Sequence, residues 1–108
     1  MKKINIIKIK DEINEVIKNR KQVKNKYYYI YYKDNKYDKY RFCICVSKKL
    51  GNAVNRNKIK RQVKDIIDKS NLVFKRNVDY VIIISKEINN IEFNKRREYL
   101  IELISKIV

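Results

Sequence analysis

Apolar positions along the chain recur with the periods of helices and strands, and they predict a series of short elements. Ile13, Val16 and Ile17 follow an i, i+3, i+4 spacing within residues 10–18, which predicts one face of a short helix. The run YYYIYY from Tyr27 to Tyr32 predicts a strand, because aromatic and β-branched side chains fit a pleated surface.

The segments around this run predict the rest of a sheet. Residues 19–26 are rich in basic and amide side chains and predict a loop or a strand edge. Residues 33–36 (KDNK) favour a turn, and residues 40–47 alternate as a second strand. We expect these two strands to form an antiparallel hairpin. Alternation places three tyrosines on one face of the first strand: Tyr27, Tyr29 and Tyr31.

The second half of the chain predicts a helix, a strand and a helix. After Gly51, the only glycine, an apolar stripe recurs at helical spacing: Ile59, Val63, Ile66 and Ile67. Residues 78–85 are almost continuously apolar, which is typical of a central, buried strand. Residues 92–108 predict a helix with a core side of Phe93, Leu100, Leu103, Ile104 and Ile107. The order α-β-β-α-β-α predicts one α/β domain, residues 1–108, with a mixed sheet covered by helices.

The charge of the chain predicts a polyanionic partner. There are 28 Lys and Arg against 12 Asp and Glu, so the net charge is +16. Such an excess favours nucleic acid first and an anionic membrane surface second. No apolar stretch is long enough to span a membrane and the first residues lack a cleavable signal pattern, so we expect a cytosolic protein.

Basic side chains gather on the helix that follows Gly51. Four polar residues share one side of it, away from the apolar stripe, and form what we call the basic face: Asn57, Lys60, Arg61 and Lys64. Arg56 lies one turn before Lys60, and Lys48, Lys49 and Asn52 precede the helix. Arg and Lys suit phosphate, and Asn suits a base edge or a 2′-hydroxyl. The alternative is a solvated surface, but the long stretch without acidic residues favours phosphate contact.

The residue types do not indicate catalysis or a metal site. The chain has no His, no paired carboxylates and no glycine-rich phosphate loop, so we expect no catalytic residue and no metal ligands. Cys43 and Cys45 share a strand face, but ring strain disfavours a disulfide, and a metal site would need further ligands. Reduced, buried thiols are the favoured interpretation. The tyrosine strand leaves two alternatives open, a stacking platform for bases or the edge of the core.

The string VSKKLGNAVNRNKIKR, from Val46 to Arg61, resembles the signature of the bacterial ribonuclease P protein component. In that family a strand ending in VSKK leads through GNAV into a helix that begins with an RN-x-x-KR motif. The string DYVIIIS, from Asp79 to Ser85, is similar to another strand of the family, and the resemblance extends over nearly the whole chain.

The resemblance implies an α+β two-layer sandwich with a mixed four-stranded sheet, about three helices and a left-handed β-α-β crossover, which normal handedness rules would not predict. It implies an accessory subunit of an endoribonuclease. The RNA subunit cleaves the 5′ leader of precursor tRNA with Mg²⁺ held mainly by RNA, and the protein binds the RNA subunit and the leader. The implied partners are these two RNAs, with neither DNA nor a membrane, and the protein is expected as a monomer in the particle.

The implied contacts fall into two sets. RNA binding is expected at Lys48, Lys49, Asn52, Arg56, Asn57, Lys60, Arg61 and Lys64. A cleft for the leader is expected between the sheet and the first helix, at Ile13, Ile17, Tyr29, Tyr31 and Ser47. The chain departs from the family pattern at several positions, which include Ile13 in place of Phe, Arg20 in place of Gly and Lys64 in place of Arg. A ribosomal or other structural RNA-binding protein and a protein-only nuclease are the alternatives.

Overall fold

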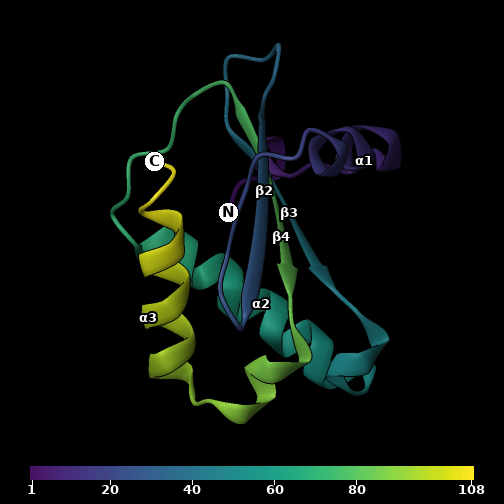
Figure 1. Ribbon diagram of the computed structural model, residues 1–108, viewed down its shortest axis with the longest axis vertical. Helices are drawn as coiled ribbons and strands as arrows, with labels where there is room; N and C mark the ends of the chain where they lie inside the picture. Colours follow the sequence, from purple (N-terminus) through teal and green to yellow (C-terminus); the bar gives the residue numbers. More distant parts are fainter.

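The computed structural model describes all 108 residues and has a four-stranded mixed sheet with helices on both sides (Figure 1). The strands are β1 (Gln22–Lys24), β2 (Tyr28–Asp34), β3 (Arg41–Val46) and β4 (Val78–Ile84). The helices are α1 (Lys10–Lys18), α2 (Ala53–Lys69) and α3 (Phe93–Ile104), with short 3₁₀-helices at Lys3–Asn5, Lys48–Leu50 and Lys86–Asn90. The expected α+β fold class is confirmed.

The strand order, β1-β2-β4-β3, differs from the expected hairpin. β2 pairs with β4 in antiparallel fashion and β3 pairs with β4 in parallel, so β4 separates the two strands that were predicted to pair. That prediction was wrong, because the apolar strand β4 takes the buried central position and leaves β3 at the edge. The backbone amide of Asn35 donates to the carbonyl of Asn77 (2.7 Å). This bond holds the connection that follows β2 against the start of β4, so residues 33–36 do not form a tight turn between β2 and β3.

A short loop and α2 connect β3 to its parallel neighbour β4. Gly51 has a φ of 114°, in the region that favours glycine, and an added Cβ would lie 3.2 Å from the side-chain nitrogen of Asn55. Asn52 caps α2, since its side-chain oxygen accepts from the amide of Asn55 (2.9 Å). The β3-α2-β4 crossover is present, and its left-handedness stays a prediction of the family resemblance.

The main core lies between one face of the sheet and the helices α2 and α3. The predicted stripe of α2 is buried in it, together with Leu100, Leu103 and Ile104 of α3. Two details of the prediction were wrong. Phe93 is 39% exposed in the first turn of α3. The helix ends at Ile104, and Ile107 packs against the core from a hydrogen-bonded turn that follows it.

Tyr27 also departs from the expected alternation. It precedes β2, and its ring packs on Tyr99 of α3 with the ring centroids 4.9 Å apart, on the side of the core. Tyr29 and Tyr31 therefore remain as the tyrosines of the opposite face. The helix α1 lies on that opposite side (Figure 1), where Val16 is buried. After α1, Arg20 has a φ of 65°, so the position where the family has glycine does take a left-handed conformation.

Candidate nucleic-acid interface

Fewer residues of the basic face of α2 are exposed than the helical spacing predicted. Asn57 and Arg61 are exposed, together with Lys58, whereas Lys60 and Lys64 are half-buried. The two half-buried lysines line a small cavity of about 70 Å³ with residues of the N-terminal segment and β3: Met1, Ile6, Ile7, Phe42, Cys43 and Ile44. The helix periodicity placed Lys60 and Lys64 away from the apolar stripe, as the structure has them. It gives no information on the N-terminal segment that partly covers the two lysines.

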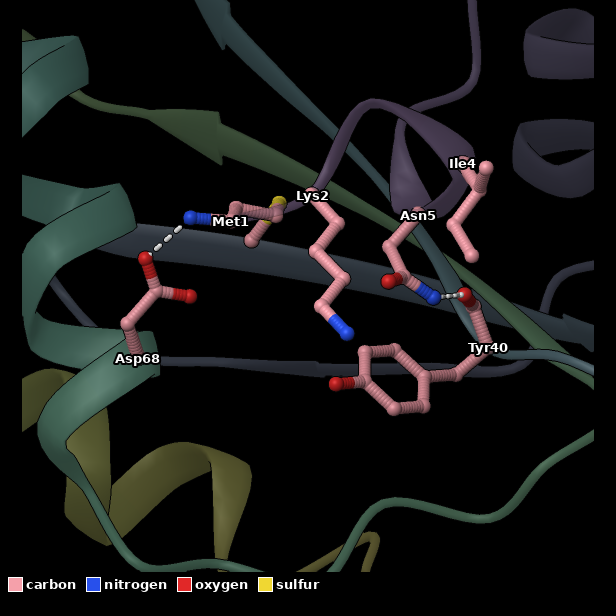
Figure 2. A pocket seen from close by; sticks show the side chains of 6 residues that line it. All are labelled: Met1, Lys2, Ile4, Asn5, Tyr40 and Asp68. Carbon is pink, nitrogen blue, oxygen red and sulfur yellow. Dashed lines mark hydrogen bonds and ion pairs between the residues drawn. The ribbon is translucent and has the colours of Figure 1, made fainter.

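That segment, residues 1–7, lies along the outer edge of β3 and reaches α2. Ile6 forms a bridge with Phe42, and the side-chain amide of Asn5 donates to the carbonyl of Tyr40 (2.6 Å). Figure 2 shows this bond and the contact between the amino group of Met1 and the carboxylate of Asp68 on α2. The six residues drawn there line a cavity of about 510 Å³.

Positive charge is left uncompensated from the end of β3 through α2. Seven Lys and Arg and no acidic residue occur between positions 48 and 64, which we call the basic segment. None of the ion pairs in the protein involves a residue of this segment. Lys48 and Lys49 are exposed, and Leu50 anchors them because it is fully buried. In Arg56 the Nε atom is buried without an acceptor. Such a segment presents several donors to an anionic ligand.

The face of the sheet turned away from the core carries the predicted leader residues of β2. The strand register places Tyr29, Ile83 and Cys45 in one row across the sheet, and Tyr31, Val81 and Cys43 in the next. We call the surface of Tyr29, Tyr31, Ile83, Cys43 and Cys45 the open sheet face. Tyr29 is 37% exposed and Tyr31 is half-buried. Two aromatic rings on a β-sheet surface suit stacking with unpaired bases.

The other predicted leader residues border this face without enclosing it. Ile13 and Ile17 are half-buried on α1, which contacts β2 and β4, and Ser47 is exposed just beyond β3. None of the cavities in the protein is lined by the five predicted residues. A cavity of about 290 Å³ does lie between α1 and the sheet, but other residues line it, among them Glu12, Val16 and Arg41. The five predicted residues therefore lie on an open surface.

An ion-pair network that the sequence analysis missed fixes α1 at one end of this face. The Nε and one terminal nitrogen of Arg41 donate to the two carboxylate oxygens of Asp79 (2.8 and 2.7 Å), and that nitrogen also donates to Glu12 of α1 (2.8 Å). Asn35 donates to Asp79 (2.7 Å), and the guanidinium of Arg41 lies 4.3 Å from the centroid of the Tyr37 ring. These bonds raise the pKa of Arg41 above its ordinary value. The sequence feature that could have indicated this network is a charged residue at or next to the start of two apolar strands, Arg41 in β3 and Asp79 in β4.

The two cysteines of β3 are close together and only half-buried. Their sulfur atoms are 3.6 Å apart. The hydrogen bond with Cys43 and the positive charge of Lys60 lower the pKa of Cys45 to about 7, against the effect of burial. The same hydrogen bond and burial raise the pKa of Cys43. The prediction of buried thiols was therefore only partly correct.

The carboxylates of the chain are scattered. Nowhere in the chain do three side chains of His, Cys, Asp or Glu gather closely enough to hold a metal ion. Asp79 and Glu12, which come close together, are both bound to Arg41. The positive charge of Arg41 already occupies both carboxylates, so this pair does not fit a Mg²⁺ ion. No helix has the length and apolar character to cross a membrane.

Comparisons with known proteins agree with one another. The family model described as Ribonuclease P matches residues 1–108. The ribonuclease P protein component of Mycoplasma mycoides subsp. mycoides is 37% identical over 108 residues, covering 99% of each chain. That of Bacillus pumilus is 34% identical over 107 residues, covering 98% of this chain and 90% of the relative.

Solved structures give the same result for the fold. The RNase P protein of Staphylococcus aureus superposes with a TM-score of 0.83 at 30% identity, covering 94% of this chain and 93% of that one. The RNase P protein of Thermotoga maritima superposes with a TM-score of 0.82 at 28% identity, covering 94% and 96%.

Proposed function

This chain belongs to the ribonuclease P protein family, and from that premise we propose that it is the protein subunit of a bacterial ribonuclease P. In this role it binds the RNA subunit and the 5′ leader of precursor tRNA, and it assists removal of the leader. The two RNAs contact different surfaces, the basic segment and the open sheet face.

The observation that carries the proposal is the uncompensated charge of the basic segment. Seven Lys and Arg side chains from the 3₁₀-helix Lys48–Leu50 and from α2 have no acidic partner. Each phosphate that they neutralise releases counterions, so the segment provides affinity for a large folded RNA. Arg61 and Asn57 are exposed in the middle of α2 and are the residues best placed for direct contacts. We therefore assign the RNA subunit to this segment.

The leader is assigned to the open sheet face because a single strand needs stacking surfaces more than it needs charge. Tyr29 and Tyr31 offer two rings to successive bases, and Ile13 and Ile17 of α1 form an apolar border. Ser47 lies at the end of β3, where the open sheet face approaches the basic segment.

Cleavage itself is assigned to the RNA subunit. The chain has no His, and its carboxylates do not gather into a site for a divalent ion. The magnesium of the holoenzyme is therefore placed on RNA, and no step of the reaction is assigned to a residue of this protein. The contribution of the protein is to hold the leader beside the catalytic RNA, which lowers the cost of positioning the substrate.

Reconstitution with the cognate RNA subunit tests the proposal. At low magnesium concentration, cleavage of precursor tRNA is expected to require both the RNA and this protein. Heat-denatured protein and an equally basic unrelated protein are the controls, because they separate a specific effect from charge screening. If the folded protein does no better than the basic control and co-purifies with ribosomes in stoichiometric amounts, the alternative of a structural RNA-binding protein replaces this one.

A further inference from the structure

The cysteine pair of β3 has the geometry of a bidentate thiol site. The sulfur atoms of Cys43 and Cys45 lie 3.6 Å apart, and both side chains are only half-buried. They lie on the open sheet face beside Val81 and Ile83 of β4, and β3 is one of the two edge strands of the sheet. No other cysteine and no histidine is present, so a thiolate ligand for a metal ion can come only from these two residues.

The distances between the two cysteines favour a metal ion shared by both sulfur atoms over a disulfide bond between them. Residues two apart in a strand have Cα atoms about 6.6–6.8 Å apart. This is the upper end of the range seen in disulfides, whose Cα atoms mostly lie about 5.5–6 Å apart. Two thiolates bound to one tetrahedral ion, with bonds of about 2.3 Å, have their sulfur atoms about 3.8 Å apart. The observed separation of 3.6 Å therefore needs almost no change to hold an ion.

We propose that Cys43 and Cys45 together bind one thiophilic metal ion of the zinc and cadmium type on the open sheet face. Binding forms two metal–sulfur bonds and breaks two S–H bonds, and the two protons go to solvent. No oxidant or reductant is needed. The chain supplies two of the four ligands, and water supplies the others in the free protein.

This site differs from what the sequence predicted. Fully buried thiols would be inert, and a tetrahedral site closed by protein would need two more ligands. Both cysteines are only half-buried and the chain supplies two ligands and no more, so the pair suits a labile site and not a structural one. The site follows from the geometry of the two sulfur atoms and does not depend on the proposed function, although it lies on the surface assigned to the leader.

Titration of the full-length protein with Cd²⁺ tests the site. In a reductant that does not chelate metals, the ultraviolet charge-transfer absorption of cadmium thiolates is expected to saturate at one ion per chain. Cys43→Ser and Cys45→Ser should each weaken binding by at least about tenfold, because each removes one of two ligands. Far-ultraviolet circular dichroism of both variants checks that they fold.

A second measurement covers the case in which a variant folds poorly. Cd²⁺ is expected to raise the Tm of the unsubstituted protein, because an ion bound only by the folded state stabilises it. The Tm of the Cys43→Ser/Cys45→Ser protein should not change with Cd²⁺. The proposal is overturned if either single variant keeps the affinity and stoichiometry of the unsubstituted protein, or if absorption rises without saturating at one ion per chain.

Discussion

Arg41 joins three parts of the molecule through one guanidinium group. It pairs with both oxygens of Asp79 on β4 and with Glu12 on α1, and it lies over the ring of Tyr37 in the connection between β2 and β3. The side chains of Arg41 and Asp79 are 9% and 7% exposed, so water cannot replace either partner. A charge buried in this way is costly when its partner is removed.

Arg41→Met is therefore expected to lower the free energy of unfolding by about 3 kcal/mol, because it leaves Asp79 buried without an opposite charge. Urea unfolding at neutral pH, followed by circular dichroism, gives the value. Arg76→Met is the matched control, since Arg76 and Asp38 pair at the same 2.8 Å but are 76% and 81% exposed. Arg76→Met should lower the free energy of unfolding by less than about 1 kcal/mol. Equal losses in the two variants would contradict the role given to Arg41.

Arg61 is the exposed basic residue at the middle of α2. Arg61→Ala is expected to weaken binding of the RNA subunit by about 1–3 kcal/mol, provided the guanidinium contacts a defined group of the RNA. A filter-binding titration at fixed salt measures the effect. Lys106→Ala removes an equal charge from an exposed position outside the basic segment and is the control. If the two variants lose the same affinity, the basic segment acts only as a source of general charge.

At the scale of elements, α1 determines the shape of the proposed leader surface. It contacts β2 and β4, and its one buried residue, Val16, holds it against the sheet. The hydrogen bond between Glu12 and Arg41 fixes its direction at the first turn. The position of Ile13 and Ile17 beside the sheet therefore depends on a charged contact in the first turn of the same helix.

Glu12→Gln is expected to weaken binding of precursor tRNA by about 1 kcal/mol, because the variant keeps the shape of the side chain and loses the charge that Arg41 holds. Binding of a tRNA without a leader should not change. Glu15→Gln is the control on the same helix, because Glu15 is 69% exposed and lies 3.9 Å from Lys33. A Glu12→Gln protein that lost affinity equally for both tRNAs would show that α1 does not act on the leader.

The existence of the elements could be predicted better than their arrangement. Apolar spacing placed α1, α2 and β4 correctly because it reports directly which side of each element is buried. It did not reveal that β4 inserts between β2 and β3, because pairing depends on contacts distant in sequence. It also missed that Lys60 and Lys64 are half-covered, because the covering segment, residues 1–7, has no periodic pattern.

At the scale of the whole molecule, the excess of charge is divided unequally between two surfaces. The basic segment has seven positive residues without partners, whereas the open sheet face consists of aromatic, aliphatic and thiol side chains. The net charge of +16 attracts any polyanion, whereas we use this division to assign a folded RNA and a single strand to different surfaces. The family resemblance, carried by residues 46–61, predicts an RNA-binding role for the first surface more directly than charge alone does.

The central claim is that these two surfaces contact different RNAs, and photo-crosslinking of the assembled particle tests it most directly. A photoreactive phenylalanine analogue is placed at position 31 in one protein and at position 61 in another. Each protein is assembled with the RNA subunit and precursor tRNA and then irradiated. Position 31 is expected to crosslink to the 5′ leader and position 61 to the RNA subunit. Crosslinks from position 31 to the RNA subunit alone, or from position 61 to the leader, would contradict the account.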